Sequence, residues 1–363
     1  MSVINFSSIQ EMGEGEEHKR YAALTISSLI SFPYVIRAAI KLGVFDIIAE
    51  VGPDAFLSSE DIASKIPNTS PTTPIALERI LRMLLINDIL KSSHADGELR
   101  PRYGLGKLGQ YLVSGAPGAS VAPTHLLAGD KVMVDGLYYL EDAVLDPSCE
   151  PFVKANGKTL FEFMGEDLRF RKVFHEAMRG GSIMTAAVIF DKYKGFEDVK
   201  DIVDVGGSSG AVVAEIVAKY PHIRGRNFDL PYVIANAPQF PGVEHVSGNM
   251  FESIPTAETI FMKSILHDWD DEQCIEILKN CWKALPDGGK VIDVDLVVPT
   301  KIENDLESLR VLGLDMTMMA CCPRGRERTI EEFQYLRKAA GFAELKDFPV
   351  SNGLRVLEFH KSL

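Results

Sequence analysis

From Val199 onward, short β-rich runs alternate with helical segments, and this alternation restricts the possible folds more than any other feature of the chain. Such alternation is typical of parallel strands that are joined by helical crossovers. We therefore expect an α/β fold whose open, mainly parallel sheet has helices on both faces and ligand sites beyond the carboxyl ends of its strands. The predicted strands are Asp201–Val205, Gly225–Asp229, Val243–Ser247, Thr259–Ile265, Lys290–Val298 and Arg355–His360.

The N-terminal part of the chain has a helical pattern instead. Apolar residues recur at helical spacing from Tyr21 to about Ala49, Ser58 precedes a second helix start, and 74–90 is amphipathic. An extended segment at 99–105 follows, so this part resembles a winged helix. Many winged helices bind DNA, but the chain has a net charge of −13 and no basic face, which argues against a nucleic-acid partner. We expect this part to mediate dimerisation.

Four segments follow from these patterns. Residues 1–20 are polar and aperiodic, which predicts a flexible N-terminus. Residues 21–120 form the winged-helix-like dimerisation domain, and 121–195 are predicted to be helical, with a Phe- and Met-rich stretch, Phe161–Met184, that is more often core than part of a ligand site. Residues 196–363 form a Rossmann-like domain. A length of 363 residues is consistent with two domains.

The cysteines and the apolar segments bear on the compartment. The five cysteines are odd in number and fit no zinc-site spacing, so we expect reduced thiols in a cytoplasmic protein. No positively charged, then apolar leader opens the chain, and no uninterrupted apolar run is long enough to cross a bilayer. We therefore expect no membrane partner.

A glycine-rich loop, Val203–Gly210, joins the first predicted strand to a helix that begins near Ala211. Glycines let the backbone turn sharply and approach a ligand closely, and the helix N-terminus behind them favours negative charge. Asp229 closes the next strand, about twenty residues further on, where a carboxylate can bind both hydroxyls of a ribose. The spacing predicts an adenosine-containing ligand.

Two other interpretations of this loop are open. It also contains G-x-S-x-G, the nucleophile elbow of α/β-hydrolases, with Ser208 as the nucleophile. An elbow normally lies well within a sheet, whereas the residues before this loop have a helical pattern. Dehydrogenases share the acid at Asp229, but their loop is G-x-G-x-x-G. The D-x-G-x-x-x-G form found here is the one that methyltransferases use, which favours S-adenosyl-L-methionine as the cofactor.

His267 falls just past the carboxyl end of the strand that begins at Thr259. A neutral imidazole can remove a phenolic proton near neutral pH, and an imidazole in this role needs a carboxylate to fix its tautomer. Alternatively, His267 caps the helix that follows. A metal site with Asp268, Asp270 and Asp271 is disfavoured, because adjacent residues on one helix cap cannot all converge on one ion, and the last two fit the first turn of a helix.

From about Tyr21 to the C-terminus, the chain resembles the plant caffeate O-methyltransferase family, whose members are metal-independent homodimers. The resemblance lies in ordered motifs: Val203–Gly210, Asn227–Pro231, Gly242–His245, Gly248–Phe251, Leu266–Trp269, Gly289–Ile292 and Arg326–Thr329. It implies S-adenosyl-L-methionine as cofactor, a helical N-terminal domain that contributes to the partner's site, and a Rossmann-like catalytic domain. It also implies a small hydroxylated aromatic acceptor, such as a phenylpropanoid, flavonoid, coumarin or alkaloid.

The resemblance also implies roles for individual residues. His267 matches the general base, and Asp295 and Glu327 match the two acids that orient it. The cofactor contacts are matched by Gly206, Asp229, Leu230, Asn249, Met250 and Lys263. The walls of the acceptor pocket are matched by Met133, Phe170, Phe174, Met178, Gly181, Asp268, Met318 and Cys322.

Several positions depart from the pattern of the caffeate enzymes, among them Ser208 and Ser209, where glycine and threonine are common. Asp295 replaces a Glu, so its carboxylate is shorter by one methylene, and either the backbone compensates or Glu327 orients His267 largely alone. Asn249 replaces an Asp. Gly181 replaces a His and Cys322 replaces an Asn, which implies a roomier and less polar acceptor pocket and an acceptor other than caffeate.

The sequence thus predicts an S-adenosyl-L-methionine-dependent O-methyltransferase with His267 as base. One alternative is N-methylation of an aromatic amine on the same fold, because an amine with a free lone pair needs the base less. A second alternative is a winged-helix binding protein with a vestigial methyltransferase domain. Asp229, Lys263, His267 and Glu327 argue against the second alternative.

Overall fold

The chain folds into two compact units in the computed structural model, which describes residues 15–67, 69–94, 100–116, 120–322 and 324–362. The first unit contains residues 1–131 and 172–181, and the second contains 132–171 and 182–363. The predicted middle segment, 121–195, is therefore divided between them. Of the predicted flexible terminus, 1–14 lie outside the described residues. Glu16 begins a helix, so that Glu16–Arg20 are helical rather than flexible.

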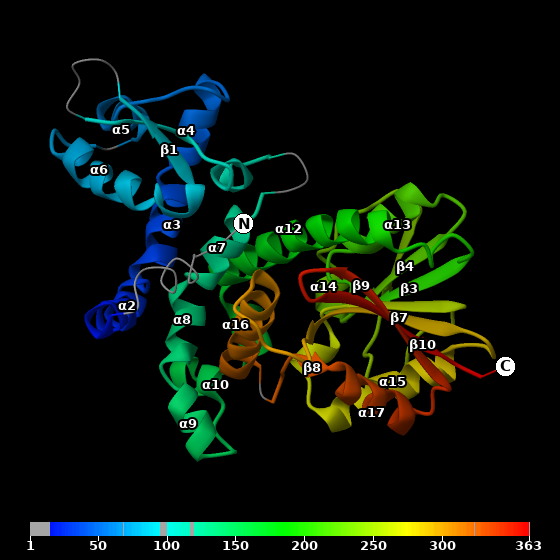
Figure 1. The fold of residues 1–363 in the computed structure, drawn as a ribbon. Coiled ribbons are helices and arrows are strands. Elements are labelled where there is room, and N and C mark those ends of the chain that lie inside the picture. Colours follow the sequence, from blue (N-terminus) through cyan, green and yellow to red (C-terminus); the bar gives the residue numbers. More distant parts are fainter. Residues whose placement is uncertain (1–14, 68, 95–99, 117–119, 323, 363) are drawn as a thin grey trace. The chain divides into compact units, whose positions relative to one another are not determined.

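The first unit consists of short helices and one two-stranded antiparallel sheet (Figure 1). Its elements are α2 (Glu16–Ser28), α3 (Ser31–Lys41), α4 (Val44–Val51), α5 (Ser59–Lys65), α6 (Thr73–Met83), the 3-10 turns η1 (Ile86–Asp88) and η2 (Gly109–Leu112), strands β1 (Leu90–Ser93) and β2 (Arg102–Leu105), and α7 (Ala122–Ala128). The helices followed by a hairpin agree with the predicted winged-helix pattern.

Two boundaries in this unit differ from the sequence prediction. The helical pattern from Tyr21 to Ala49 is three helices. Helix α2 ends at Ser28 before α3 begins at Ser31, and Gly43, with a φ of +70°, separates α3 from α4. The helix predicted to reach Leu90 ends at Met83, and Leu90 instead begins β1 and pairs with Leu105. Leu84 and Leu90 are fully buried, so the apolar run continues although the helix does not.

Helix α2 exposes its apolar side chains. None of its residues is buried, and Tyr21 and Leu24 are each more than 60 % exposed. By length and composition alone, an 18-residue window within the helical stretch Glu16–Lys41 is apolar enough to cross a membrane, with a mean hydropathy of 1.5. Arg37 and several Ser and Thr residues interrupt the apolar run, so this finding does not contradict the expectation that no uninterrupted apolar run is long enough to cross a bilayer.

The second unit contains a sheet with helices on both faces. Its helices are α8 (Lys131–Leu137), α9 (Leu140–Leu145), α10 (Pro151–Asn156), α11 (Leu160–Glu166), α12 (Leu168–Lys192), α13 (Ala211–Lys219), α14 (Pro231–Ile234), α15 (Asp271–Ala284), α16 (Leu306–Cys321), α17 (Ile330–Ala340) and the 3-10 turn η3 (Leu266–Asp268). Helix α8 begins at the boundary between the units, and the middle of α12 belongs to the first unit. Its strands are β3 (Asp201–Val205), β4 (Arg224–Asp229), β5 (Val243–Ser247), β6 (Thr259–Lys263), β7 (Lys290–Val298), β8 (Arg328–Thr329), β9 (Glu344–Ser351) and β10 (Leu354–His360).

The strand order is β5-β4-β3-β6-β7-β10-β9, with β8 paired to the end of β7. The five strands from β5 to β7 are parallel, while β10 is antiparallel to both of its neighbours. This confirms the predicted open, mainly parallel sheet. The sequence prediction missed β9, most of whose side chains are exposed or half-exposed and which contains Pro349. It also missed β8, which has only two residues.

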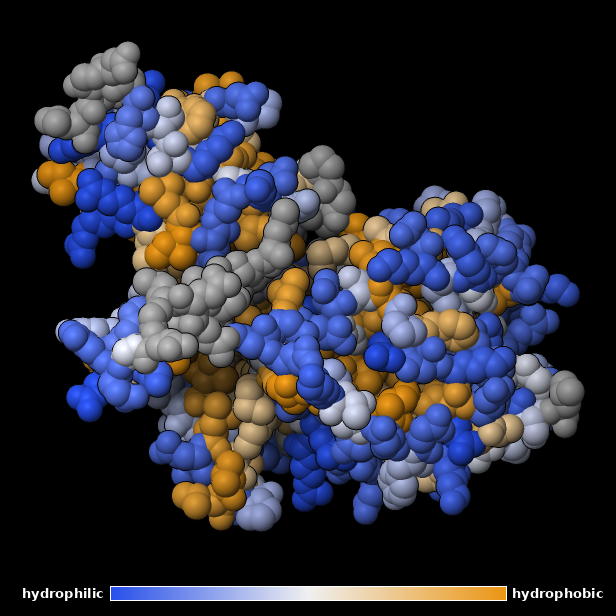
Figure 2. Space-filling view, in the orientation of Figure 1, coloured by the Kyte–Doolittle hydropathy of each residue, from blue (hydrophilic) through white to orange (hydrophobic). Residues whose placement is uncertain are grey.

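Two apolar layers cover the sheet (Figure 1). Helices α15 and α17 pack on one face, where Cys274, Ile277 and Phe333 meet Val291 and Leu357. The other face is covered by α13, α16 and the last turns of α12. Away from the sheet, Figure 2 shows hydrophobic colour over α8 and α9, which is consistent with the exposed side chains of Leu137, Val144 and Leu145.

The packing of α13 on the sheet depends on a glycine in β4. A Cβ on Gly225 would lie 2.6 Å from Cγ2 of Val217 and 2.9 Å from Cγ2 of Val213. We expect Gly225→Ala to lower the free energy of unfolding by about 1–3 kcal/mol through overpacking, measured by denaturant unfolding. Gly313→Ala is the matched control. It lies in the exposed middle of α16 with no atom within 4 Å of its new Cβ, and it should leave stability unchanged or raise it by up to about 1 kcal/mol. Equal losses in both variants would contradict this packing.

Candidate active site

The glycine-rich loop leaves β3 at its carboxyl end, as the sequence predicts. Gly206 has a φ of +69°, and its N–H donates to the carbonyl of Phe228 at 2.9 Å. A Cβ on Gly206 would lie 2.4 Å from Cδ1 of Ile265, and a Cβ on Gly207 would lie 2.2 Å from Oδ1 of Asn227. The loop therefore needs glycine at both positions, because each backbone lies against a neighbouring strand. Gly210, with a φ of +80°, precedes the first residue of α13.

A buried amide ties this loop to β5. Asn227 is fully buried in β4, and its Nδ2 donates to the carbonyl of Ser208 at 3.0 Å and lies 3.1 Å from Nδ1 of His245. The other ring nitrogen of His245 lies 2.9 Å from the carbonyl of Pro238. The loop is thus fixed by side chains from the two strands beyond β3. The sequence motifs contain Asn227 and His245, but their spacing did not reveal this link.

The predicted cofactor residues lie at the carboxyl ends of neighbouring strands. Asp229 ends β4, where its Oδ2 accepts from the N–H of Ser208 at 2.8 Å and its Oδ1 accepts from the N–H of Leu230 at 2.7 Å. Asn249 and Met250 follow β5. Lys263 ends β6, and its Nζ lies 3.3 Å from Oγ of Ser264. The parallel register therefore brings these residues to one edge of the sheet.

His267 lies in η3, just beyond β6, and is 9 % exposed. Its Nδ1 lies 2.8 Å from Oε1 of Glu327, a buried carboxylate on the segment that precedes β8. Glu327 is held in turn, because its backbone N–H donates to Oδ1 of Asp315 on α16 at 2.9 Å. His267 does not cap the next helix. The N-cap of α15 is Asp270, whose Oδ1 accepts from the N–H of Gln273 at 2.9 Å.

The loop that carries His267 is clamped by Arg328, a residue that the sequence analysis did not single out. Arg328 is 1 % exposed. Its guanidinium donates to the carbonyl of Leu266 at 2.7 Å, to the carbonyl of Trp269 at 2.8 Å, and to Oδ1 of Asp271 at 2.9 Å. These acceptors flank His267 on both sides. Arg328 thereby fixes the backbone of η3, while the adjacent Glu327 fixes the ring.

Asp295 does not share this role directly. It is 1 % exposed on β7, and neither of its carboxylate oxygens has a hydrogen-bond partner among the residues that the structure describes. Of the two possibilities for its shorter side chain, the second therefore applies: Glu327 alone is hydrogen-bonded to the imidazole. Burial raises the pKa of Asp295 to about 7, although the charges of His267 and Lys263 act to lower it.

Acidic groups dominate the electrostatics of His267. Burial alone would lower the pKa of the imidazole, but Asp268, the hydrogen bond to Glu327, and Asp295 outweigh burial and raise the pKa to about 10. Nε2 of His267 lies 3.6 Å from Oδ1 of Asp268. For Lys263, burial lowers the pKa, and nearby acids oppose the effect only in part. The acids around the ring therefore favour the protonated form of His267 in the ligand-free protein.

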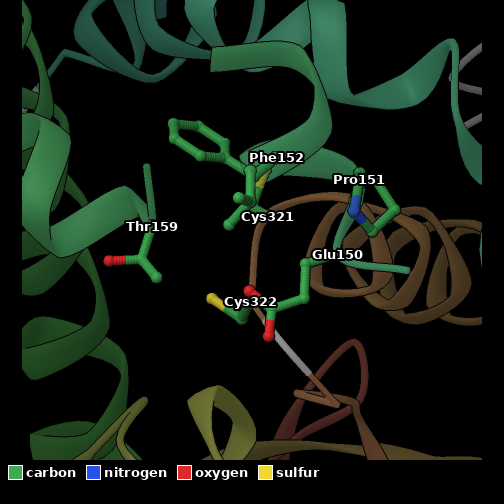
Figure 3. Close-up of a pocket in the computed structure, with 8 residues that line it drawn as sticks. Glu150, Pro151, Phe152, Thr159, Cys321 and Cys322 are labelled. Carbon is green, nitrogen blue, oxygen red and sulfur yellow. The ribbon is translucent and has the colours of Figure 1, made fainter. Parts of the chain in front are cut away.

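The predicted acceptor residues fall into two groups. Met133, Phe170, Asp268, Met318 and Cys322 belong to the second unit. There, Sγ of Cys322 donates to Oδ1 of Asp268, the residue next to His267, at 3.4 Å. A recess next to Cys322 is shown in Figure 3 and is lined by Glu150, Pro151, Phe152, Val153, Thr159, Ala320, Cys321 and Cys322.

The remaining acceptor residues, Phe174, Met178 and Gly181, belong to the first unit. Met178 is 38 % exposed, and no atom lies within 4 Å of a Cβ built on Gly181. Their role as pocket walls stays a prediction.

Comparison with known proteins identifies the family. The O-methyltransferase domain family matches residues 137–343, and the O-methyltransferase dimerisation domain matches residues 24–115. The chain is 47 % identical to (S)-scoulerine 9-O-methyltransferase of Coptis japonica over 97 % of this chain and 92 % of that protein. It is 46 % identical to caffeic acid 3-O-methyltransferase of Prunus dulcis over 95 % of each chain. The chain belongs to the O-methyltransferase family.

The fold agrees with this assignment. Human N-acetylserotonin methyltransferase in complex with SAM has a TM-score of 0.84, covers 97 % of this chain and 100 % of its own, and is 20 % identical, which shows the shared fold. The protein is a methyltransferase that uses S-adenosyl-L-methionine. The residues present fit this cofactor, since the glycine cradle after β3 and the acid that ends β4 stand at one edge of the sheet. Among the described residues, no group of three or more His, Cys, Asp or Glu side chains could hold a metal ion.

Because Arg328 holds the backbone on both sides of His267, we expect even its conservative replacement by lysine to destabilise the protein strongly. In Arg328→Lys, the single ammonium cannot reach both backbone carbonyls and Asp271 together. We expect the free energy of unfolding to fall by about 3–5 kcal/mol, because a buried charge network loses its fork-shaped donor, measured by denaturant unfolding. The matched control is Arg326→Lys, at a half-exposed residue that also pairs with Asp271, where the loss should be about 0–1 kcal/mol. If the two variants lost the same stability, Arg328 would not be the clamp.

Proposed function

We propose that this enzyme transfers the methyl group to a hydroxyl of a plant phenolic, with His267 as the general base. The observation that carries the proposal is the hydrogen bond between Nδ1 of His267 and buried Glu327. This bond fixes the tautomer in which Nδ1 carries the proton and Nε2 has the free lone pair. Nε2 is then the atom that accepts the phenolic proton.

The chain's own residues perform three tasks in this mechanism. Glu327 orients the ring and stabilises the imidazolium that forms when the acceptor loses its proton. Arg328 holds the backbone on both sides of the ring. The glycine-rich loop and Asp229 hold S-adenosyl-L-methionine, which supplies an electrophilic methyl group on a sulfonium that leaves as a neutral thioether. With the cofactor and acceptor bound, much of the rate enhancement would come from holding the acceptor oxygen close to the methyl carbon and aligned with it.

The pKa of His267 gives this mechanism a pH dependence. With its pKa raised to about 10 in the ligand-free protein, the ring must lose a proton before it can act as a base. The rate of methyl transfer therefore rises with pH. A cation bound beside the ring lowers the pKa of an imidazole, so the rise lies at lower pH in the cofactor complex than in the ligand-free protein.

The acceptor is a small aromatic with a free hydroxyl, drawn from the phenylpropanoids, coumarins, flavonoids or alkaloids. Relatives named for scoulerine, caffeic acid and desmethyl-yatein support this range. Cys322 and Gly181 offer fewer hydrogen bonds than the Asn and His of the caffeate pattern, which favours an acceptor less polar than caffeate. The five free cysteines support a reducing compartment, and we place the enzyme in the cytoplasm.

The base is tested by His267→Ala with the best acceptor from a panel that includes caffeate and (S)-scoulerine. We expect kcat to fall by about 10²–10⁴-fold, with the affinity for S-adenosyl-L-methionine, measured calorimetrically, nearly unchanged. His222→Ala, at an exposed ring that contacts the carbonyl of Glu197, is the matched control and should keep full activity. EDTA should not slow either enzyme. Near-normal turnover by His267→Ala would contradict the base assignment and favour N-methylation of an amine.

We also propose a homodimer that forms through the first unit. The dimerisation-domain match covers 24–115, and it includes most of the stretch Glu16–Lys41, in which Leu24, Ile26, Ile30 and Tyr34 are exposed. A second copy of the chain would bury them, since exposed apolar patches of this kind mark interaction surfaces.

The dimer is tested with Leu24→Asp combined with Ile30→Asp, at side chains that are 65 % and 71 % exposed. We expect this variant to be a monomer by light scattering, because a buried unpaired carboxylate opposes association. Ile75→Asp, at a residue of α6 that is 60 % exposed, should remain a dimer. A monomeric wild-type protein would refute the proposal, and wild-type protein that partitions into lipid vesicles would favour a membrane partner instead.

A further inference from the structure

A second buried acid lies on the same strand as Asp295. Asp293 is fully buried in β7, two residues before Asp295, and side chains two residues apart on a strand point to the same face. All four carboxylate oxygens of the pair are buried without a hydrogen-bond partner among the described residues. Oε2 of Glu327, the acid that orients His267, is unpartnered in the same way.

The immediate surroundings of Asp293 are apolar. Its register partners are Met262 on β6 and Leu357 on β10, and neither is exposed to solvent. The thiols of Cys274 and Cys281 on α15 complete this environment, since the pKa of each is raised by burial and further by Asp293. An ionised carboxylate in such surroundings carries a large desolvation cost unless it is paired, and a buried acid without a partner binds a proton instead.

Four charged groups act on Asp293, one from its own strand and three from neighbouring segments. Burial raises the pKa of Asp293 well above its usual range and Asp295 and Glu327 add to the rise, whereas His267 and Arg328 oppose it. Arg328 makes no hydrogen bond to Asp293, and its guanidinium donates instead to Leu266, Trp269 and Asp271. The two oxygens of Asp293 therefore remain without a positive partner.

We propose that Asp293 is a positioning residue of the active site, which stays a neutral carboxylic acid and donates a hydrogen bond that keeps Asp295 ionised beside His267. Residues two apart on a strand are separated by roughly 6.6 Å. A hydrogen bond over that distance requires rotation of the two carboxyl groups toward each other or one buried water, which needs two to four polar partners. The unpartnered oxygens of Asp293, Asp295 and Glu327 supply these partners.

The protonation state is tested by infrared difference spectroscopy of the wild-type enzyme against Asp293→Asn. At mildly alkaline pH, Asp204 and Asp295, each with a pKa of about 7, have largely ionised. We expect a carbonyl band of a neutral carboxylic acid in the wild type that is absent from Asp293→Asn. The absence of such a difference would overturn the proposal. This measurement needs no acceptor and does not depend on the proposed reaction.

The positioning role rests on the proposed function and is tested by the pH profile of kcat/KM for two variants. Asp293→Asn keeps an uncharged donor, so its profile should match the wild type. Asp293→Val removes the donor, which raises the pKa of Asp295 and reduces the negative charge beside His267. We expect its acid limb to move to lower pH and kcat to fall by about 10- to 100-fold, with unchanged affinity for S-adenosyl-L-methionine.

Two outcomes of the kinetic test would overturn the proposal. A shift in Asp293→Asn as large as that in Asp293→Val would mean that Asp293 is ionised in the wild type. Two unchanged profiles would mean that Asp293 does not act on the base.

Measuring the free energy of unfolding as a function of pH separates these effects from misfolding. A raised pKa contributes stability that is present below about pH 4 and is lost as pH rises, so Asp293→Val should gain stability relative to the wild type toward alkaline pH.

Discussion

The hydrogen bond between His267 and Glu327 is the interaction on which the rest of the site depends. It joins η3, beyond β6, to the segment before β8, so that two elements far apart in sequence meet at the carboxyl edge of the sheet. Each partner is held by a further residue, Glu327 through Asp315 and the loop of His267 through Arg328. Because both partners are buried, the bond is shielded from water and the ring keeps a single orientation.

The acids around His267 have two opposing effects on its role as a base. Asp268, Asp295 and Glu327 surround one imidazole, and their combined charge stabilises the imidazolium strongly. Such stabilisation favours proton removal from an acceptor but opposes the neutral ring that must begin the reaction. The balance depends on how many of these acids are ionised. A protonated Asp293 next to Asp295 is one way in which this chain regulates that charge.

Much of the fold could be predicted from the sequence, because strand and helix periodicities are strong in the second unit. The glycine-rich loop, Asp229 and His267 lie where their positions relative to the strands predict. The sequence prediction failed in two places where the local pattern does not reveal the tertiary structure. The apolar run through Leu90 changes from helix to strand without changing its hydrophobicity. Strand β9 was missed because it lacks an apolar face. Arg328 and Asp293 were missed because burial of a charged side chain leaves no periodic signal. The geometry of Asp295 could not be predicted, since one methylene decides whether its carboxylate reaches the ring.

The central claim is tested most directly by a crystal structure of the enzyme with S-adenosyl-L-homocysteine and a phenolic acceptor. The account predicts that Nδ1 of His267 remains hydrogen-bonded to Glu327 and that Nε2 faces the acceptor hydroxyl, which lies between the ring and the cofactor sulfur. A ring turned so that Nε2 points away from that hydroxyl, or an acceptor bound out of its reach, would contradict the account.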